Sequence, residues 1–137
     1  MADDENTIVR DSNDWLLEFL VDLADKKVEL LITLQVGGML VSGILASGEA
    51  YFDAVGSQLS DAKAPEDMKR AMSQLEDLYR KEANAERDPG ITVIHLKEAR
   101  FFMPGSAPVP TNQAVWWRGR LSEVAGFVIG GLEYSSQ

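Results

Sequence analysis

The chain has 137 residues, of which 45% are hydrophobic, so it is long and apolar enough to form one domain with a buried core. It contains no cysteine, which excludes disulfides, thiolate metal sites and a cysteine nucleophile. The net charge of −9 is uneven, because residues 1–90 hold 19 acidic and 9 basic side chains while residues 91–137 hold 3 and 4. An acidic front repels nucleic-acid backbones and anionic lipid surfaces. We therefore expect no nucleic acid among the partners. The last third of the chain is nearly neutral, so it suits a protein partner better than a polyanion.

The N-terminal sequence MADDENTIVRD is acidic and polar, and it lacks the basic start and apolar run of a secretory signal. No stretch approaches eighteen consecutive apolar residues, the minimum for a membrane-spanning helix. These features predict a cytoplasmic protein without membrane insertion. Residues 1–10 are expected to form a flexible acidic tail, and residues 11–137 a single α+β domain.

A first helix is predicted after the tail. Ser12 or Asn13 is the expected N-cap, and Asp14 favours the positive end of the helix dipole. The helix extends for about four turns and closes at Lys26 and Lys27. Acidic residues mark its polar side, and the apolar side is expected to consist of Trp15, Leu16, Phe19, Leu20 and Leu23.

A β-hairpin is predicted next. Residues 28–36 alternate between apolar and other side chains, which indicates a strand with one apolar face. The dipeptide Gly37-Gly38 marks a tight turn, and residues 39–46 form the return strand. Gly43 inside the return strand indicates a bulge or a sharp bend.

Two helices are expected after this hairpin. The first contains Tyr51, Phe52, Val55 and Leu59 at helical spacing, and Ser47 is its expected cap. The second runs from Pro65 to about Ala83. Its apolar stripe is Met68, Ala71, Met72, Leu75, Leu78 and Tyr79.

Residues 91–132 contain three apolar runs rich in Ile, Val, Phe and Trp, which we interpret as a three-stranded meander. The first strand begins at Ile91 and is expected to bend near residues 97–100. A proline-rich loop occupies residues 104–112, and a turn at residues 122–124 precedes a last strand over residues 125–132. Trp116 and Trp117 are adjacent, so in a strand they point to opposite faces.

The element order is therefore helix, strand, strand, helix, helix, strand, strand, strand. This order predicts an α+β fold with a small curled antiparallel five-stranded sheet or an SH3/Sm-like barrel, an N-terminal helix and a two-helix insertion after the second strand. The barrel is the preferred architecture, since the bend expected at Gly43 is the device by which small barrels curl a sheet. A flat sheet with helices on one face is the alternative.

No catalytic signature is found. His95 lies in a predicted strand without an acid to orient it, and a lone strand histidine is usually structural. The glycine pairs fit no phosphate-binding motif, and no metal-ligand spacing is present. Lys97, Arg100, Arg118 and Arg120 are compatible with a basic strip for single-stranded nucleic acid, but four charges in an acidic chain favour a solvated sheet face. We expect a non-enzymatic protein with no cofactor and no metal.

Several sequence blocks resemble a known family. The blocks are ITLQVGGMLVSGILASGEAYF (32–52) and, within residues 91–130, IHLKEARFF, PVPTN and WWRGRLSEVAGFVIG. Together they cover roughly half of the chain, and they resemble the gas vesicle accessory protein U family. The resemblance implies a cytoplasmic accessory protein, associated with gas vesicles, that acts in their assembly or in their organisation and clustering. The implied partners are the vesicle shell or other gas vesicle accessory proteins, and unpaired sheet edges are compatible with a homo-oligomer.

The resemblance supplies no catalytic residues. From the residues themselves we predict a partner interface on the last third of the chain, comprising Trp116, Trp117, Arg118, Arg120, Pro108 and Pro110. The alternative hypothesis is an Sm-like barrel that uses the same face to bind RNA or a small ligand.

Overall fold

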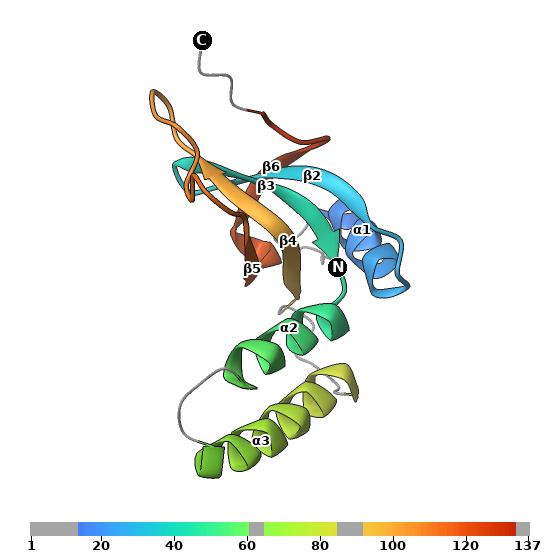
Figure 1. Cartoon of the computed structure of the whole chain (residues 1–137). Helices are drawn as coiled ribbons and strands as arrows, with labels where there is room; N and C mark the ends of the chain where they lie inside the picture. The colour runs from blue at the N-terminus through green and yellow to red at the C-terminus, as the bar shows by residue number, and fades with distance from the viewer. Residues whose placement is uncertain (1–13, 61–64, 85–91, 134–137) are drawn as a thin grey trace, which may run out of the picture.

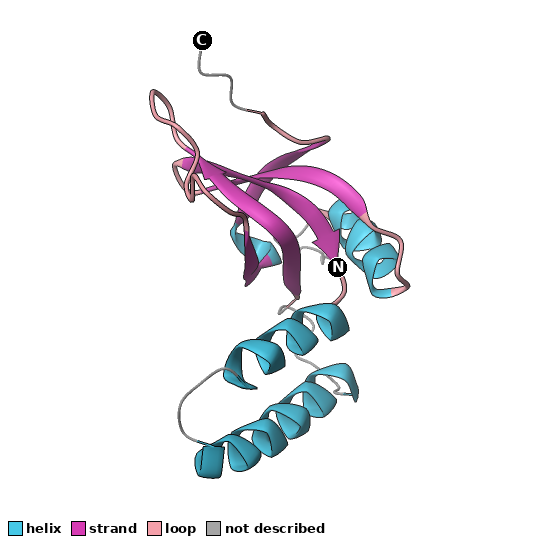
Figure 2. Cartoon of the chain, viewed as in Figure 1, coloured by secondary structure: helices cyan, strands magenta, loops and turns pink. Residues whose placement is uncertain are grey.

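A computed structural model describes residues 14–60, 65–84 and 92–133. Within these ranges the chain combines three α-helices with one antiparallel sheet of five strands, which confirms the predicted α+β class and element order (Figures 1 and 2). The elements are α1 (Trp15–Asp25), β2 (Leu30–Val36), β3 (Met39–Ala46), α2 (Gly48–Ser60), α3 (Pro65–Asn84), β4 (Val93–Phe102), β5 (Val115–Arg120), the 3-10 turn η1 (Leu121–Glu123) and β6 (Val124–Ile129). The predicted tail, residues 1–10, and Ile91 lie outside the described residues.

The strands follow the order β5-β4-β3-β2-β6, and the sheet is open. The predicted barrel is therefore wrong, and the curled-sheet form of the prediction is right. The predicted meander is also wrong, because β6 pairs with β2 and not with β5. The short turn η1, whose Leu121 is buried in the core, instead connects β5 at one edge of the sheet to β6 at the other edge.

The first hairpin and its bend are as predicted. β2 and β3 pair in register from Leu30–Leu45 to Val36–Met39, and Gly37 in the turn has a φ of +61°. Opposite Gly43 the β3–β4 register shifts by one residue, and Glu98 of β4 takes a φ of +54°. A β-bulge therefore bends β4 within the range expected from the sequence.

One sheet face packs on α1 and forms the hydrophobic core. Ile32 and Leu34 of β2 are fully buried there, as the alternation of residues 28–36 predicts. The other core members come from α1, β3, β4 and η1: Leu17, Leu20, Val21, Ala24, Val41, Leu45, Ile94, Leu96, Ala99 and Leu121. Trp117, Val124 and Phe127 pack against this cluster.

Helix α1 differs from the prediction in its cap and in its buried face. Asp14 is the N-cap, and its Oδ1 accepts a hydrogen bond from the Leu16 N–H at 2.8 Å. Ser12 and Asn13 lie outside the described residues. Only Leu20 of the predicted apolar side is among the buried residues of the helix, which are Leu17, Leu20, Val21 and Ala24. Trp15 and Phe19 are 74% and 53% exposed.

Helices α2 and α3 form a hairpin at one end of the sheet (Figures 1 and 2). Ser47 caps α2, as predicted, because its Oγ accepts a hydrogen bond from the Ala50 N–H at 3.0 Å. Gly56 allows α2 to approach α3, since a Cβ at this position would lie 3.1 Å from Cε of Met72. Leu78 is 59% exposed, so the predicted apolar stripe of α3 is only partly covered.

Candidate functional site

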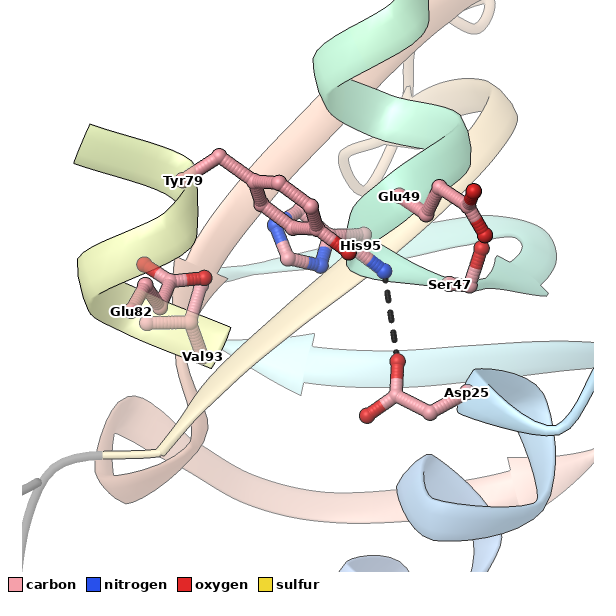
Figure 3. A pocket seen from close by; sticks show the side chains of 8 residues that line it. Asp25, Ser47, Glu49, Tyr79, Glu82, Val93 and His95 are labelled. Atoms are coloured by element: carbon pink, nitrogen blue, oxygen red, sulfur yellow. Dashed lines mark hydrogen bonds between the residues drawn. The ribbon is translucent and has the colours of Figure 1, made fainter. Parts of the chain in front are cut away.

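A pocket of about 240 Å³ lies where the C-terminal end of α1, the start of α2, α3 and β4 meet (Figure 3). Four different elements therefore supply its lining. These residues are Asp25 from α1, Ser47, Gly48 and Glu49 at the start of α2, Tyr79 and Glu82 from α3, and Val93 and His95 from β4.

His95 is the buried polar residue of this pocket, with only 5% of its surface exposed. Its Nε2 lies 2.8 Å from Nη1 of Arg118 on β5. Arg118 also donates from Nη2 to Oε1 of Glu82 at 2.7 Å. Because a guanidinium can only donate, Nε2 accepts and the imidazole proton is on Nδ1. The row Glu82–Arg118–His95 thus connects α3 to two strands of the sheet.

This arrangement keeps the imidazole neutral. Burial, and after it the positive charge of Arg118, lower the pKa of His95 to about 4, although the negative charge of Glu82 acts in the opposite direction. A general base that works near neutral pH needs a pKa close to that pH. His95 therefore fits a structural role, as its position in the sequence indicated.

Aromatic rings surround the same histidine. The Tyr51 ring lies 4.7 Å from the His95 ring between centroids, at an interplanar angle of 34°. Trp116 meets Tyr51 edge-on at 5.9 Å, and Phe52 lies 5.0 Å from Tyr79. These contacts join α2, α3 and the sheet into one aromatic cluster.

The carboxylates of the pocket have different partners. Oδ1 of Asp25 accepts a hydrogen bond from the Gly48 N–H at 3.2 Å (Figure 3). Glu49 forms an ion pair with Lys27, which lowers the pKa of Glu49 and raises that of Lys27. Burial raises the pKa of Tyr79, and the charges of Glu49 and Asp25 raise it further.

A second surface feature is the outer side of α1. Trp15, Leu16 and Phe19 are all exposed and share one side of the helix, which we call the α1 apolar patch. Next to it lie the acidic Glu18 and Asp22. Large exposed apolar groups with a polar rim are typical of protein-binding sites.

The chain matches the sequence model of the family described as gas vesicle protein GvpU-like, over residues 14–132. The chain belongs to the GvpU-like family. The match confirms the resemblance seen in the sequence and extends from α1 through α2 and α3 to the end of β6. No curated protein and no solved structure matches the chain. Among the residues described, no helix is both long and apolar enough to cross a membrane.

In this GvpU-like chain the residues predicted for the interface lie on both faces of β5 and in the loop between β4 and β5. Trp117 packs against the core, while Trp116 lies on the opposite face beside Tyr51, so the two tryptophans do point to opposite faces. Arg118 is held between Glu82 and His95, and Arg120 is exposed.

The two prolines of the predicted interface lie in a loop that folds back on β4. Phe101 and Val109 exchange two backbone hydrogen bonds, of 2.7 and 2.9 Å. Pro108 is buried and Pro110 is half-buried. Of the six residues predicted for the interface, Arg120 is therefore the most accessible.

Two of the four basic residues considered for nucleic acid have acidic partners. Lys97 forms an ion pair with Glu29 at 2.9 Å, and Arg118 pairs with Glu82. The open sheet removes the barrel on which the RNA-binding alternative depended. No group of three potential metal ligands is found among the described residues.

Sequence reasoning missed the α1 apolar patch and the acidic members of the pocket. The patch has a signal in the sequence, because Leu17, Leu20, Val21 and Ala24 also recur at helical spacing. The helix thus has two apolar sides, and only one can face the core. The pocket has no such signal, since Asp25, Glu49 and Glu82 look like ordinary solvated charges.

Proposed function

We propose that this chain is a non-enzymatic accessory protein that acts in the assembly, organisation or clustering of gas vesicles through contacts with other proteins. Membership of the GvpU-like family supplies the link to gas vesicles. The observation that supports the protein contacts is the α1 apolar patch, where Trp15 is 74% and Phe19 is 53% exposed. Burying one such aromatic side chain is worth about 1.5–3 kcal/mol, so a few of them can anchor a specific contact.

The partner is the vesicle shell or another accessory protein of the vesicle. The patch is apolar and its neighbours Glu18 and Asp22 are acidic, so it suits a partner that offers an apolar surface beside basic groups. Trp116 and Arg120 remain a second predicted contact, on the opposite side of the sheet from the core. No observation favours RNA binding over this function.

Flotation of the purified protein with intact gas vesicles tests the proposal. We expect the protein to rise with the vesicles at low salt and to remain bound at moderate salt, because apolar contacts are not screened by ions. Loss of binding at moderate salt would exclude an apolar interface. Absence of binding at both salt concentrations would exclude the finished vesicle as the partner.

A further inference from the structure

The outer edge of β6 is an open strand edge of the sheet. On one side β6 pairs with β2, and none of the strands in the described ranges pairs with its other side. We propose that this edge binds the same edge of a second copy of the chain, so that two sheets join antiparallel across a two-fold axis. The inference does not depend on the proposed function.

The backbone of β6 presents hydrogen-bonding groups at this edge. The Gly130 N–H donates to the Leu31 carbonyl oxygen at 2.8 Å, in the register of the β2–β6 pairing. Hydrogen-bonded and non-hydrogen-bonded pairs alternate along an antiparallel ladder. Val128 therefore bonds to β2 as Gly130 does, whereas Phe127 and Ile129 direct their N–H and C=O groups away from β2. These outward groups can form a further ladder.

The side chains at this edge are apolar and exposed. Val128 is 60% exposed and Ile129 is 62% exposed. The sequence of β6, VAGFVI, contains no charged residue. Edge strands are usually protected from association by charged side chains. The other edge strand, β5, has this protection in Arg118 and Arg120, so β6 is the edge that is open to association.

A second copy of β6 suits this edge because the strand is complementary to itself. Each chain carries a net charge of −9, but two uncharged strands can pair antiparallel without bringing like charges together. Glu123 and Glu133 flank the strand. The chain leaves the edge before Glu133, since the Leu132 N–H donates to Oγ of Ser42 on β3 at 3.0 Å. The two glutamates therefore do not meet across the axis.

The outward backbone groups also define the register of the pairing. With Val128 on the two-fold axis, Phe127 of each copy stands opposite Ile129 of the other, and both residues use their outward N–H and C=O groups. Val128 then faces Val128 of the second copy in a non-hydrogen-bonded pair, in which the Cα atoms lie about 4.5 Å apart. The exposed side chains of Val128 and Ile129 thereby become buried, which stabilises the dimer.

Sedimentation equilibrium of the full-length protein, over a wide range of concentrations, tests the inference. We expect a reversible equilibrium between monomer and dimer. A protein that stays monomeric would leave the edge of β6 to a strand of a different protein and would overturn the inference. Growth into longer rows of copies would overturn the two-fold pairing.

Charges placed on the two-fold axis locate the contact. Val128→Lys and Val128→Glu each bring two like charges together, so we expect either variant to self-associate about tenfold more weakly than the wild-type protein, or weaker still. An equal mixture of the two variants should recover the dimer, because lysine then faces glutamate. Val128 does not belong to the core, so both variants should fold.

Val28→Lys is the matched control for these variants, since Val28 is 50% exposed and precedes the first residue of β2. We expect it to dimerise as the wild-type protein does. Undiminished dimerisation of Val128→Lys, or a mixture of the two charged variants that stays monomeric, would overturn the pairing through β6.

Hydrogen exchange measured by NMR gives a second readout, at the backbone. We expect the amides of Phe127 and Ile129 to exchange more slowly as the protein concentration rises. The Val128 amide should change least, because it already bonds to β2 in the monomer. Exchange at Phe127 and Ile129 that does not depend on concentration would place a dimer contact elsewhere and would overturn the inference.

Discussion

Gly43 lies where β3 passes the bulge of β4, and there is no room for a side chain. A Cβ at this position would lie 2.9 Å from the Lys97 carbonyl oxygen and 3.1 Å from Cα of Ala99. Both atoms belong to the backbone, so they cannot move aside cheaply. The glycine is therefore required by the close approach of two strands.

The substitution Gly43→Ala tests this requirement. We expect it to lower the free energy of unfolding by about 1–3 kcal/mol, the usual cost of overpacking. Gly38→Ala is the matched control, because a Cβ at Gly38 would have no neighbour within 4 Å. Urea denaturation of both variants measures the difference, and equal stabilities would contradict the role given to Gly43.

His95 makes the stability of the fold depend on pH. Its pKa of about 4 lies below the ordinary value of 6.5, so between these values the unfolded chain binds more protons than the folded chain. The contribution of the neutral imidazole is complete above pH 6.5 and is lost as the pH falls towards 4. The full loss is about 3 kcal/mol.

Comparison with His95→Gln isolates this contribution from those of the other ionisable side chains. We expect the wild-type protein to lose more unfolding free energy than the variant between pH 7 and pH 4.5, measured by urea denaturation. The same loss in both proteins would show that the pKa of His95 in the folded protein is close to its ordinary value of 6.5.

At the scale of elements, the sequence predicted which segments form helices and strands but not which side of α1 faces the core. The stripe with Trp15 and Phe19 and the stripe with Leu17 and Val21 have the same period. Periodicity cannot choose between two apolar sides, whereas packing against the sheet does. The α1 apolar patch follows from that choice. The strand that precedes the turn at Gly37 and Gly38 has only one apolar face, so its buried side could be predicted.

The α2–α3 hairpin is joined to the sheet partly through one ion pair. Glu82→Gln removes the charge that holds Arg118, with 2.7 Å between Oε1 and Nη2 in the wild-type protein. We expect faster hydrogen exchange in α2 and α3 and unchanged exchange in β2 and β3, because the core does not involve Glu82. Glu76→Gln is the control, since Glu76 is exposed on the same helix. Uniformly faster exchange in all elements would contradict a local role.

At the scale of the whole molecule, strand count and class could be predicted from the sequence, but closure and strand order could not. The bend could be predicted because Gly43 is a glycine inside a predicted strand. The connection through η1 from β5 to β6 depends on the burial of Leu121 against residues that are far away in the sequence. The partners of Arg118 on α3 and β4 could not be predicted for a similar reason, because they lie far away in the sequence.

The most direct test of the account is flotation of a variant that lacks the α1 apolar patch. Trp15→Ser combined with Phe19→Ser removes two exposed aromatic rings without opening the core, so the fold should survive. Leu78→Ser is the control, since Leu78 is a 59% exposed apolar residue on α3. We predict that the double variant loses most of its binding to intact gas vesicles, while Leu78→Ser and the wild-type protein rise with them. Undiminished flotation of a folded double variant would contradict the assignment of the contact to α1.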